Sequence, residues 1–154
     1  MHVVLVAPEI PPNTGNIART CAATGTILHL VEPLGFSISD RNLKRAGVDY
    51  WHLVEVHVHA SWEALPNALR VPQRLHLFTS HAKTRYTDIA YERDDVLVFG
   101  RESVGLGPEI LGQYPDRARV IPMTGAVRSL NLSNAVAIVV YEAQRQQGFP
   151  EWDV

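Results

Sequence analysis

The chain has 154 residues, 46% hydrophobic and 19% charged, which is enough for one globular domain with a core and leaves almost nothing for a second. Its formal net charge of −2 excludes a general attraction to polyphosphate, so any contact with a nucleic acid must be local. The single cysteine excludes an intramolecular disulfide and a multi-cysteine metal site.

The apolar run at residues 3–7 is too short to span a membrane, and no basic leader precedes it. We therefore expect a soluble, cytoplasmic protein with no membrane association.

Short apolar runs alternate with helix-like segments along the whole chain. The runs are mostly apolar throughout, which is typical of strands covered by helices on both faces of a mainly parallel sheet. They are residues 3–7, 27–31, 53–58, 75–79, 96–100 and 118–121. Helices are expected at residues 16–24, 39–46, 61–68, 108–111 and 132–147. The sequence therefore predicts a single α/β domain over residues 1–154.

The first loop that departs from ordinary turn composition, residues 8–19, is rich in proline and leads into the first helix. Asn13 or Asn16 is the expected N-cap of that helix. Ligands of open α/β sheets gather beyond the carboxyl ends of the strands, and Arg19 could direct its guanidinium into that crevice. The alternative is a surface arginine beside a capping asparagine.

The second loop, residues 100–107, contains three glycines, which let a ligand approach the backbone closely, and one carboxylate, Glu102. Its glycine spacing matches neither G-x-G-x-x-G nor a Walker loop, which disfavours dinucleotide and nucleoside triphosphate binding. The alternative is a tight turn between a strand and a helix.

The third loop, residues 121–131, leads into the C-terminal helix. Four polar residues lie close together where it meets that helix: Ser129, Asn131, Ser133 and Asn134. One of them would suffice as a helix cap, so the cluster indicates further hydrogen-bonding work.

Taken together, these three segments resemble the three signature motifs of the SPOUT class of RNA methyltransferases, in the same order. Residues 13–19 resemble motif one, residues 99–106 motif two and residues 121–135 motif three. The chain length and the opening Pro-Glu-Ile-Pro-Pro-Asn-Thr-Gly-Asn are similar to the TrmL (YibK) subfamily. The resemblance covers essentially the whole chain.

The resemblance implies a parallel sheet with a deep C-terminal trefoil knot, a rare exception to the rule that chains do not thread their own loops. It also implies that S-adenosyl-L-methionine (S-adenosylmethionine) lies bent in the knot. Carried over by position, the cofactor-binding residues are Phe78, Gly100, Glu102, Ile121, Met123, Ser129 and Leu130.

By the same resemblance, the protein is a homodimer whose active sites combine residues of both subunits, and Arg19 is the leading catalytic residue. A guanidinium stays protonated and is a poor base. We therefore expect Arg19 to orient the nucleotide phosphate and stabilise developing alkoxide charge, while the proton passes to phosphate or water. Glu102 is a more ordinary base, but its place in a cofactor loop favours a structural or cofactor role.

The partner implied is tRNA. The candidate RNA-binding residues are Arg41, Lys44, Arg45, Lys83, Arg85 and Arg128, with Tyr141 as a possible stacking residue. Each could equally be a solvated surface charge or, for Tyr141, a packing or interface residue. Motif two departs from the family pattern at Val104, where relatives often have a basic residue.

We assign no function to two further features, a pair of histidines and the single cysteine. His57 and His59 lie on one face of a predicted strand, but no third ligand is evident, so we expect no metal site. Cys21 lies among alanines on a helix and is expected to pack as a small apolar residue.

The resemblance thus implies methylation of the ribose 2′-hydroxyl of the wobble nucleotide, position 34, a cytidine or modified uridine, in leucine tRNAs. One alternative is a SPOUT enzyme acting on ribosomal RNA or on another tRNA position. Another is a nucleotide-binding regulatory module without catalysis, which a doubly wound sheet alone would permit.

Overall fold

The computed structural model describes residues 1–39, 50–69, 74–150 and 152. The helix expected at residues 39–46 lies almost entirely outside these ranges. So do three candidate RNA-binding residues, Arg41, Lys44 and Arg45.

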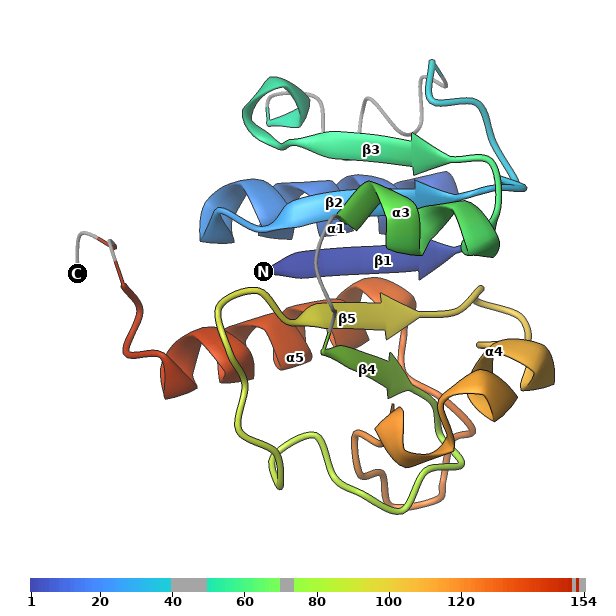
Figure 1. The fold of residues 1–154 in the computed structure, drawn as a ribbon, viewed down its shortest axis with the longest axis vertical. Helices are drawn as coiled ribbons and strands as arrows, with labels where there is room; N and C mark the ends of the chain where they lie inside the picture. Colours follow the sequence, from blue (N-terminus) through green and yellow to red (C-terminus); the bar gives the residue numbers. More distant parts are fainter. Residues whose placement is uncertain (40–49, 70–73, 151, 153–154) are drawn as a thin grey trace.

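Six parallel strands form one sheet in the order β3-β2-β1-β5-β4-β6. They are β1 His2–Val6, β2 Ile27–Val31, β3 Val56–His59, β4 Leu75–Phe78, β5 Val96–Phe99 and β6 Ala118–Arg119. The prediction of a mainly parallel sheet is confirmed. Because all the strands run the same way, their carboxyl ends meet at one edge of the sheet (Figure 1).

Helices cover both faces of the sheet. They are α1 Pro11–Thr24, α3 Leu65–Leu69, α4 Pro108–Gln113 and α5 Leu132–Gln146. One core cluster joins the sheet to α1 and α5, and a second joins the opposite face to α3 and α4 (Figure 1). Because both faces of the sheet are covered, every residue of β4 and β5 is buried, and all of them except His76 are apolar. Among the described helices, none is long and apolar enough to cross a membrane.

The start of α1 differs from the prediction. The helix begins at Pro11, its N-cap is Ile10, and no side chain of that residue caps it, so neither Asn13 nor Asn16 has the expected role. Two prolines fit the first helical positions because the missing N–H groups would find no intrahelical partner there. Asn13 is thereby moved into the helix, where it is buried.

Two strands, β3 and β6, are two residues shorter than predicted. The apolar run at residues 53–58 begins with a 3-10 helix, Trp51–Leu53, before β3. β6 ends at Arg119, after which Val120 exchanges backbone hydrogen bonds with the segment after β4: Tyr86 N donates to Val120 O at 2.9 Å, and Val120 N to Thr84 O at 2.9 Å. The C-terminal helix agrees with its prediction to within one residue.

The segment between β4 and β5 is also fixed to α5. The Gln146 side chain accepts a hydrogen bond from Tyr91 N at 3.0 Å and donates one to Ile89 O at 3.1 Å. One long connection thus contacts both the strand that precedes the third loop and the helix that follows it.

A chain of histidines crosses β1, β2 and β3. His2 Nδ1 lies 3.0 Å from His29 Nε2, and His29 Nδ1 lies 2.9 Å from His59 Nε2. Burial, followed by the neighbouring imidazoles, lowers the pKa of His29 to about 3, and burial also lowers the pKa values of His2 and His59. The chain is therefore neutral at physiological pH.

This histidine chain predicts acid-sensitive folding. In the unfolded chain His29 regains its ordinary pKa of 6.5, so below that pH the unfolded state binds a proton that the folded state does not bind until about pH 3. The free energy of unfolding should fall as the pH drops through this window, by at most about 1.4 kcal/mol per pH unit for one such histidine. Thermal unfolding should show that His29→Gln loses less stability than the wild type between pH 7 and 5. The exposed His52→Gln should lose as much stability as the wild type. Equal slopes for His29→Gln and the wild type would contradict the account.

Candidate active site

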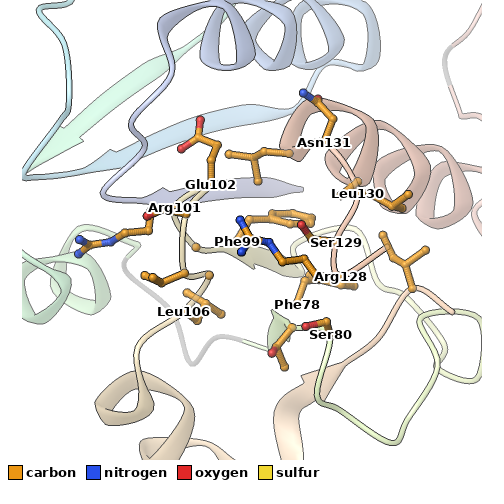
Figure 2. A pocket seen from close by; sticks show the side chains of 18 of the residues that line it. Phe78, Ser80, Phe99, Arg101, Glu102, Leu106, Arg128, Ser129, Leu130 and Asn131 are labelled. Atoms are coloured by element: carbon orange, nitrogen blue, oxygen red, sulfur yellow. The ribbon is translucent and has the colours of Figure 1, made fainter. Parts of the chain in front are cut away.

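A pocket of about 600 Å³ opens at the carboxyl ends of β4 and β5 (Figure 2). The three loops singled out in the sequence meet there. All seven residues expected to bind the cofactor line it: Phe78, Gly100, Glu102, Ile121, Met123, Ser129 and Leu130. Residue 78 and the segments at residues 100–102 and 121–130 thus converge on one cavity of the size used for cofactors.

The base of the pocket is aromatic. Phe78 and Phe99 end two paired strands in register, and their rings stack with centroids 4.7 Å apart and planes 11° apart. Leu106 and Leu130 add apolar surface. Phe99 was not among the predicted site residues, although its position at the end of a strand next to β4 could have indicated it.

The Glu102 carboxylate fastens the second loop to the start of α1. Oε2 accepts from Glu9 N at 2.8 Å, and Oε1 accepts from Ile10 N at 3.1 Å and from Asn13 Nδ2 at 3.2 Å. A negative charge at a helix N-terminus is also favoured by the helix dipole. With three donors on its two oxygens, Glu102 acts as a structural group, as its place in a cofactor loop had suggested.

A second carboxylate makes the reciprocal contact. Glu9 Oε1 accepts from Ser103 Oγ at 2.9 Å, and Oε2 accepts from Ser103 N at 3.0 Å. These hydrogen bonds lower the pKa of Glu9. Together, Glu9 and Glu102 join the first and second loops in both directions.

Asn13 extends this fastening to the third loop. Its Oδ1 accepts from Asn131 Nδ2 at 3.0 Å, while Asn131 Oδ1 caps α5 by accepting from Ser133 N at 2.9 Å and Asn134 N at 3.3 Å. The polar cluster of the third loop therefore does more than cap a helix, as predicted. Asn131 joins two helix N-termini, and Ser129 lines the pocket.

Gly100 has a steric role within its own loop. A Cβ atom at this position would lie 2.0 Å from the backbone carbon of Gly105 and 2.2 Å from Leu106 N. The loop folds back because Gly105 adopts a φ of +73° and donates from its N to Arg101 O at 2.8 Å. Gly100 was expected so that a ligand could approach closely. The structure shows another reason for a glycine here, which is the close approach of the loop's own backbone.

Cationic side chains border the pocket. Arg101 and Arg128 both line it; Figure 2 shows Arg128 extending back over the pocket and the Arg101 guanidinium pointing away. Lys83 and Arg85 are exposed on the segment after β4. Tyr141 lies on α5 beyond the pocket, with its ring edge-on to Trp152 at 5.7 Å between centroids.

Arg19 does not line this pocket. It is exposed on α1, where Nη2 donates to Tyr50 Oη at 3.2 Å and the guanidinium lies 4.6 Å from the centre of the Tyr50 ring. The predicted catalytic residue and the predicted cofactor site are therefore separate within one chain.

The remaining candidates are the histidines of β3 and Cys21. Within residues 1–39, 50–69, 74–150 and 152, no three His, Cys, Asp or Glu side chains are arranged to hold a metal ion. Cys21 is fully buried, and burial raises the pKa of its thiol to about 12, in agreement with its prediction as a packing residue.

Residues 1–141 match the model of the SpoU rRNA methylase family. The chain belongs to this family. The predicted α/β fold with a parallel sheet and the recognition of the chain as an RNA methyltransferase are thereby confirmed.

Curated members of the SpoU methylase family resemble nearly the whole chain. A protein of Burkholderia ambifaria is 50% identical over 150 residues, 96% of each chain, and one of Methylovorus glucosotrophus is 51% identical over 148 residues, again 96% of each. Both are named tRNA (cytidine(34)-2'-O)-methyltransferase.

Solved structures of the family agree. One described as giving structural insights into the 2-OH methylation of C/U34 on tRNA has a TM-score of 0.92 and 45% identity over 96% of both chains. The SpoU methyltransferase AviRb from Streptomyces viridochromogenes, in complex with the cofactor AdoMet, has a TM-score of 0.83 and 25% identity over 96% of this chain and 57% of that one.

The Gly100 geometry predicts that Gly100→Ala displaces the second loop. We expect the affinity for S-adenosylmethionine, measured by calorimetry, to fall by roughly 10-fold or more. Gly112→Ala is the matched control: a Cβ there meets nothing within 4 Å, so its stability should change by no more than about 0.5–1 kcal/mol and its affinity should stay unchanged. Undiminished affinity in Gly100→Ala would show that the folded-back loop is not needed for the pocket.

Proposed function

We propose that this protein transfers a methyl group from S-adenosylmethionine to the ribose 2′-hydroxyl of the wobble nucleotide, position 34, of tRNA. The observation that carries the proposal is the identity of about 50%, over 96% of the chain, to relatives named for this reaction. The three-loop pocket supports it as a place for the donor.

The pocket residues suit S-adenosylmethionine chemically. Apolar side chains, among them Phe78, Leu106 and Leu130, suit an adenine, and the hydroxyls of Ser80 and Ser129 are polar partners for a ribose or an amino acid moiety. The bound donor would supply an electrophilic methyl group on a positively charged sulfur. A structure of AviRb contains this cofactor.

The remaining task is to align the attacking 2′-oxygen and stabilise the charge that it develops. In our proposal Arg19 does both, because its guanidinium can grip a phosphate bidentately while remaining positive. The 2′-hydroxyl proton then passes to phosphate or water. Glu102 takes no part as a base, since its oxygens accept from Glu9, Ile10 and Asn13.

Because Arg19 lies outside the pocket of its own chain, we propose that it completes the pocket of a second subunit in a homodimer. The proposed interface includes α5, on which Ile138 and Tyr141 are 38% and 45% exposed at a spacing of one turn. Symmetric dimers of this kind are common among small enzymes. A dimer would also widen the RNA-binding face of a single-domain, cytoplasmic enzyme.

For tRNA binding we propose Arg128, at the pocket, and Lys83 and Arg85, on the neighbouring exposed segment. Arg41 and Arg45 remain proposed contacts from residues outside the described ranges. Tyr141 fits an interface better than base stacking, because Trp152 already contacts its ring. We also propose that the substrates are leucine tRNAs. This part of the proposal is supported by the resemblance to the subfamily alone.

We also propose the C-terminal trefoil knot. The segment between β4 and β5 contacts the backbone of Val120, just before the third loop, and the side chain of Gln146, at the end of α5. These contacts are those that a threaded loop would need. Ribosomal RNA is the second candidate substrate, because the matching family is described by it.

The reaction is tested by incubating the protein with labelled S-adenosylmethionine and unfractionated tRNA from a strain that lacks it, and then mapping the modified ribose. We expect one 2′-O-methyl group at position 34 of a subset of tRNAs. Label in ribosomal RNA alone, or at another tRNA position, would refute the proposed substrate.

In the same assay, Arg19→Ala should abolish transfer and leave the affinity for S-adenosylmethionine nearly unchanged, while the exposed Arg117→Ala should be active. At a donor concentration that the Gly100→Ala pocket binds only poorly, mixing Arg19→Ala with Gly100→Ala should restore about a quarter of the wild-type rate per chain, since about half of the dimers are then mixed and each has one complete site. No restoration would contradict a shared active site. A large loss of donor affinity in Arg19→Ala would contradict the proposed role of this arginine.

A further inference from the structure

The described contacts of the Arg19 side chain come from one residue, Tyr50. Nη2 donates to the Tyr50 hydroxyl at 3.2 Å, and Cζ lies 4.6 Å from the ring centroid, within the range of a cation–π contact. The two residues are 31 positions apart and belong to different segments. The contact is therefore a product of the fold and has no counterpart in any sequence motif.

Tyr50 is held at this place by the core. It immediately precedes the 3-10 helix Trp51–Leu53 and accepts a backbone hydrogen bond from Leu53 N at 2.9 Å. Trp51 and Val54 pack against the same core cluster that includes Ile17 and Ala18 of α1. The half-buried Tyr50 ring therefore presents a fixed surface beside the exposed face of α1.

The chemical nature of Tyr50 is as important for Arg19 as its position. A carboxylate beside Arg19 would neutralise the guanidinium and occupy its bidentate edge. A tyrosine restricts the side chain without neutralising its charge, and it uses one of the five N–H donors of the guanidinium. No other hydrogen bond from this guanidinium is found in the part of the chain that the structure describes, and its remaining donors suit a phosphate or an oxyanion.

We propose that Tyr50 is a positioning residue that pre-orients the Arg19 guanidinium for the nucleotide. The proposal rests on the proposed function of Arg19 as the group that stabilises the attacking ribose oxygen. Without Tyr50, a long exposed arginine on α1 would distribute among many rotamers, and only some would reach the substrate. One exposed cation–π contact corresponds to roughly a 2- to 5-fold change in population, and the hydrogen bond adds a similar factor.

The test compares Tyr50→Phe, which keeps the ring and loses the hydroxyl, with Tyr50→Leu, which loses both contacts. We expect kcat for tRNA methylation to fall about 2- to 3-fold in the first and about 10-fold in the second. Calorimetry with S-adenosylmethionine should give an unchanged affinity and stoichiometry in both variants. Tyr114→Phe is the matched control, because Tyr114 is also half-buried but lies on the opposite side of the sheet, against Trp62.

A merely structural role would predict a different pattern: a lower melting temperature and a lower binding stoichiometry, with no graded effect between the two variants. That pattern would overturn the proposal. Wild-type kcat in Tyr50→Leu would also overturn it, and inactivity of Arg19→Ala in the same assay would then leave the role of Arg19 intact. Full activity of Arg19→Ala would overturn both.

Discussion

The site depends on the Glu102 carboxylate at the start of α1. Its oxygens accept three hydrogen bonds from residues 9, 10 and 13, which joins the second loop to the first. Charge-assisted hydrogen bonds of this kind are each worth about 1.5–3 kcal/mol, and the helix dipole adds to them. Asn13 then carries the connection to Asn131 and so to the third loop. One acidic side chain thereby fixes the relative positions of all three loops.

In this arrangement the polar residues fall into two groups with different contacts. The polar side chains of Glu102 and Asn131, at the pocket, hold loops and helix ends together. The Arg19 guanidinium lies outside the pocket, against the ring of Tyr50. The fold thus builds in each chain a pocket that we propose for the methyl donor, and it leaves exposed the arginine that we propose for the nucleotide, an arrangement that suits the proposed completion by a second subunit.

Much of the architecture could be predicted from the sequence because the relevant signals are local. Continuously apolar runs predicted buried parallel strands, and the helix expected at residues 132–147 agrees with α5 to within one residue. The seven pocket residues were carried over by position from the family resemblance, and all line one cavity. The rest depends on contacts between distant segments. The residues just before α1 are held by Glu102, about 90 residues away in the sequence, and no local pattern could have indicated this contact. A glycine is required at position 100 because the backbone five residues later lies against it. The Arg19 guanidinium contacts a tyrosine that lies beyond β2 in the sequence.

The most direct test of the account is calorimetric titration of S-adenosylmethionine into the wild-type protein and into Glu102→Gln. A glutamine retains the size of the side chain but offers one acceptor oxygen without charge, so it cannot hold both loops. The account predicts one donor bound per wild-type chain and an affinity weaker by roughly 10-fold or more in the folded variant. Equal affinities, or no heat of binding in the wild type, would contradict it.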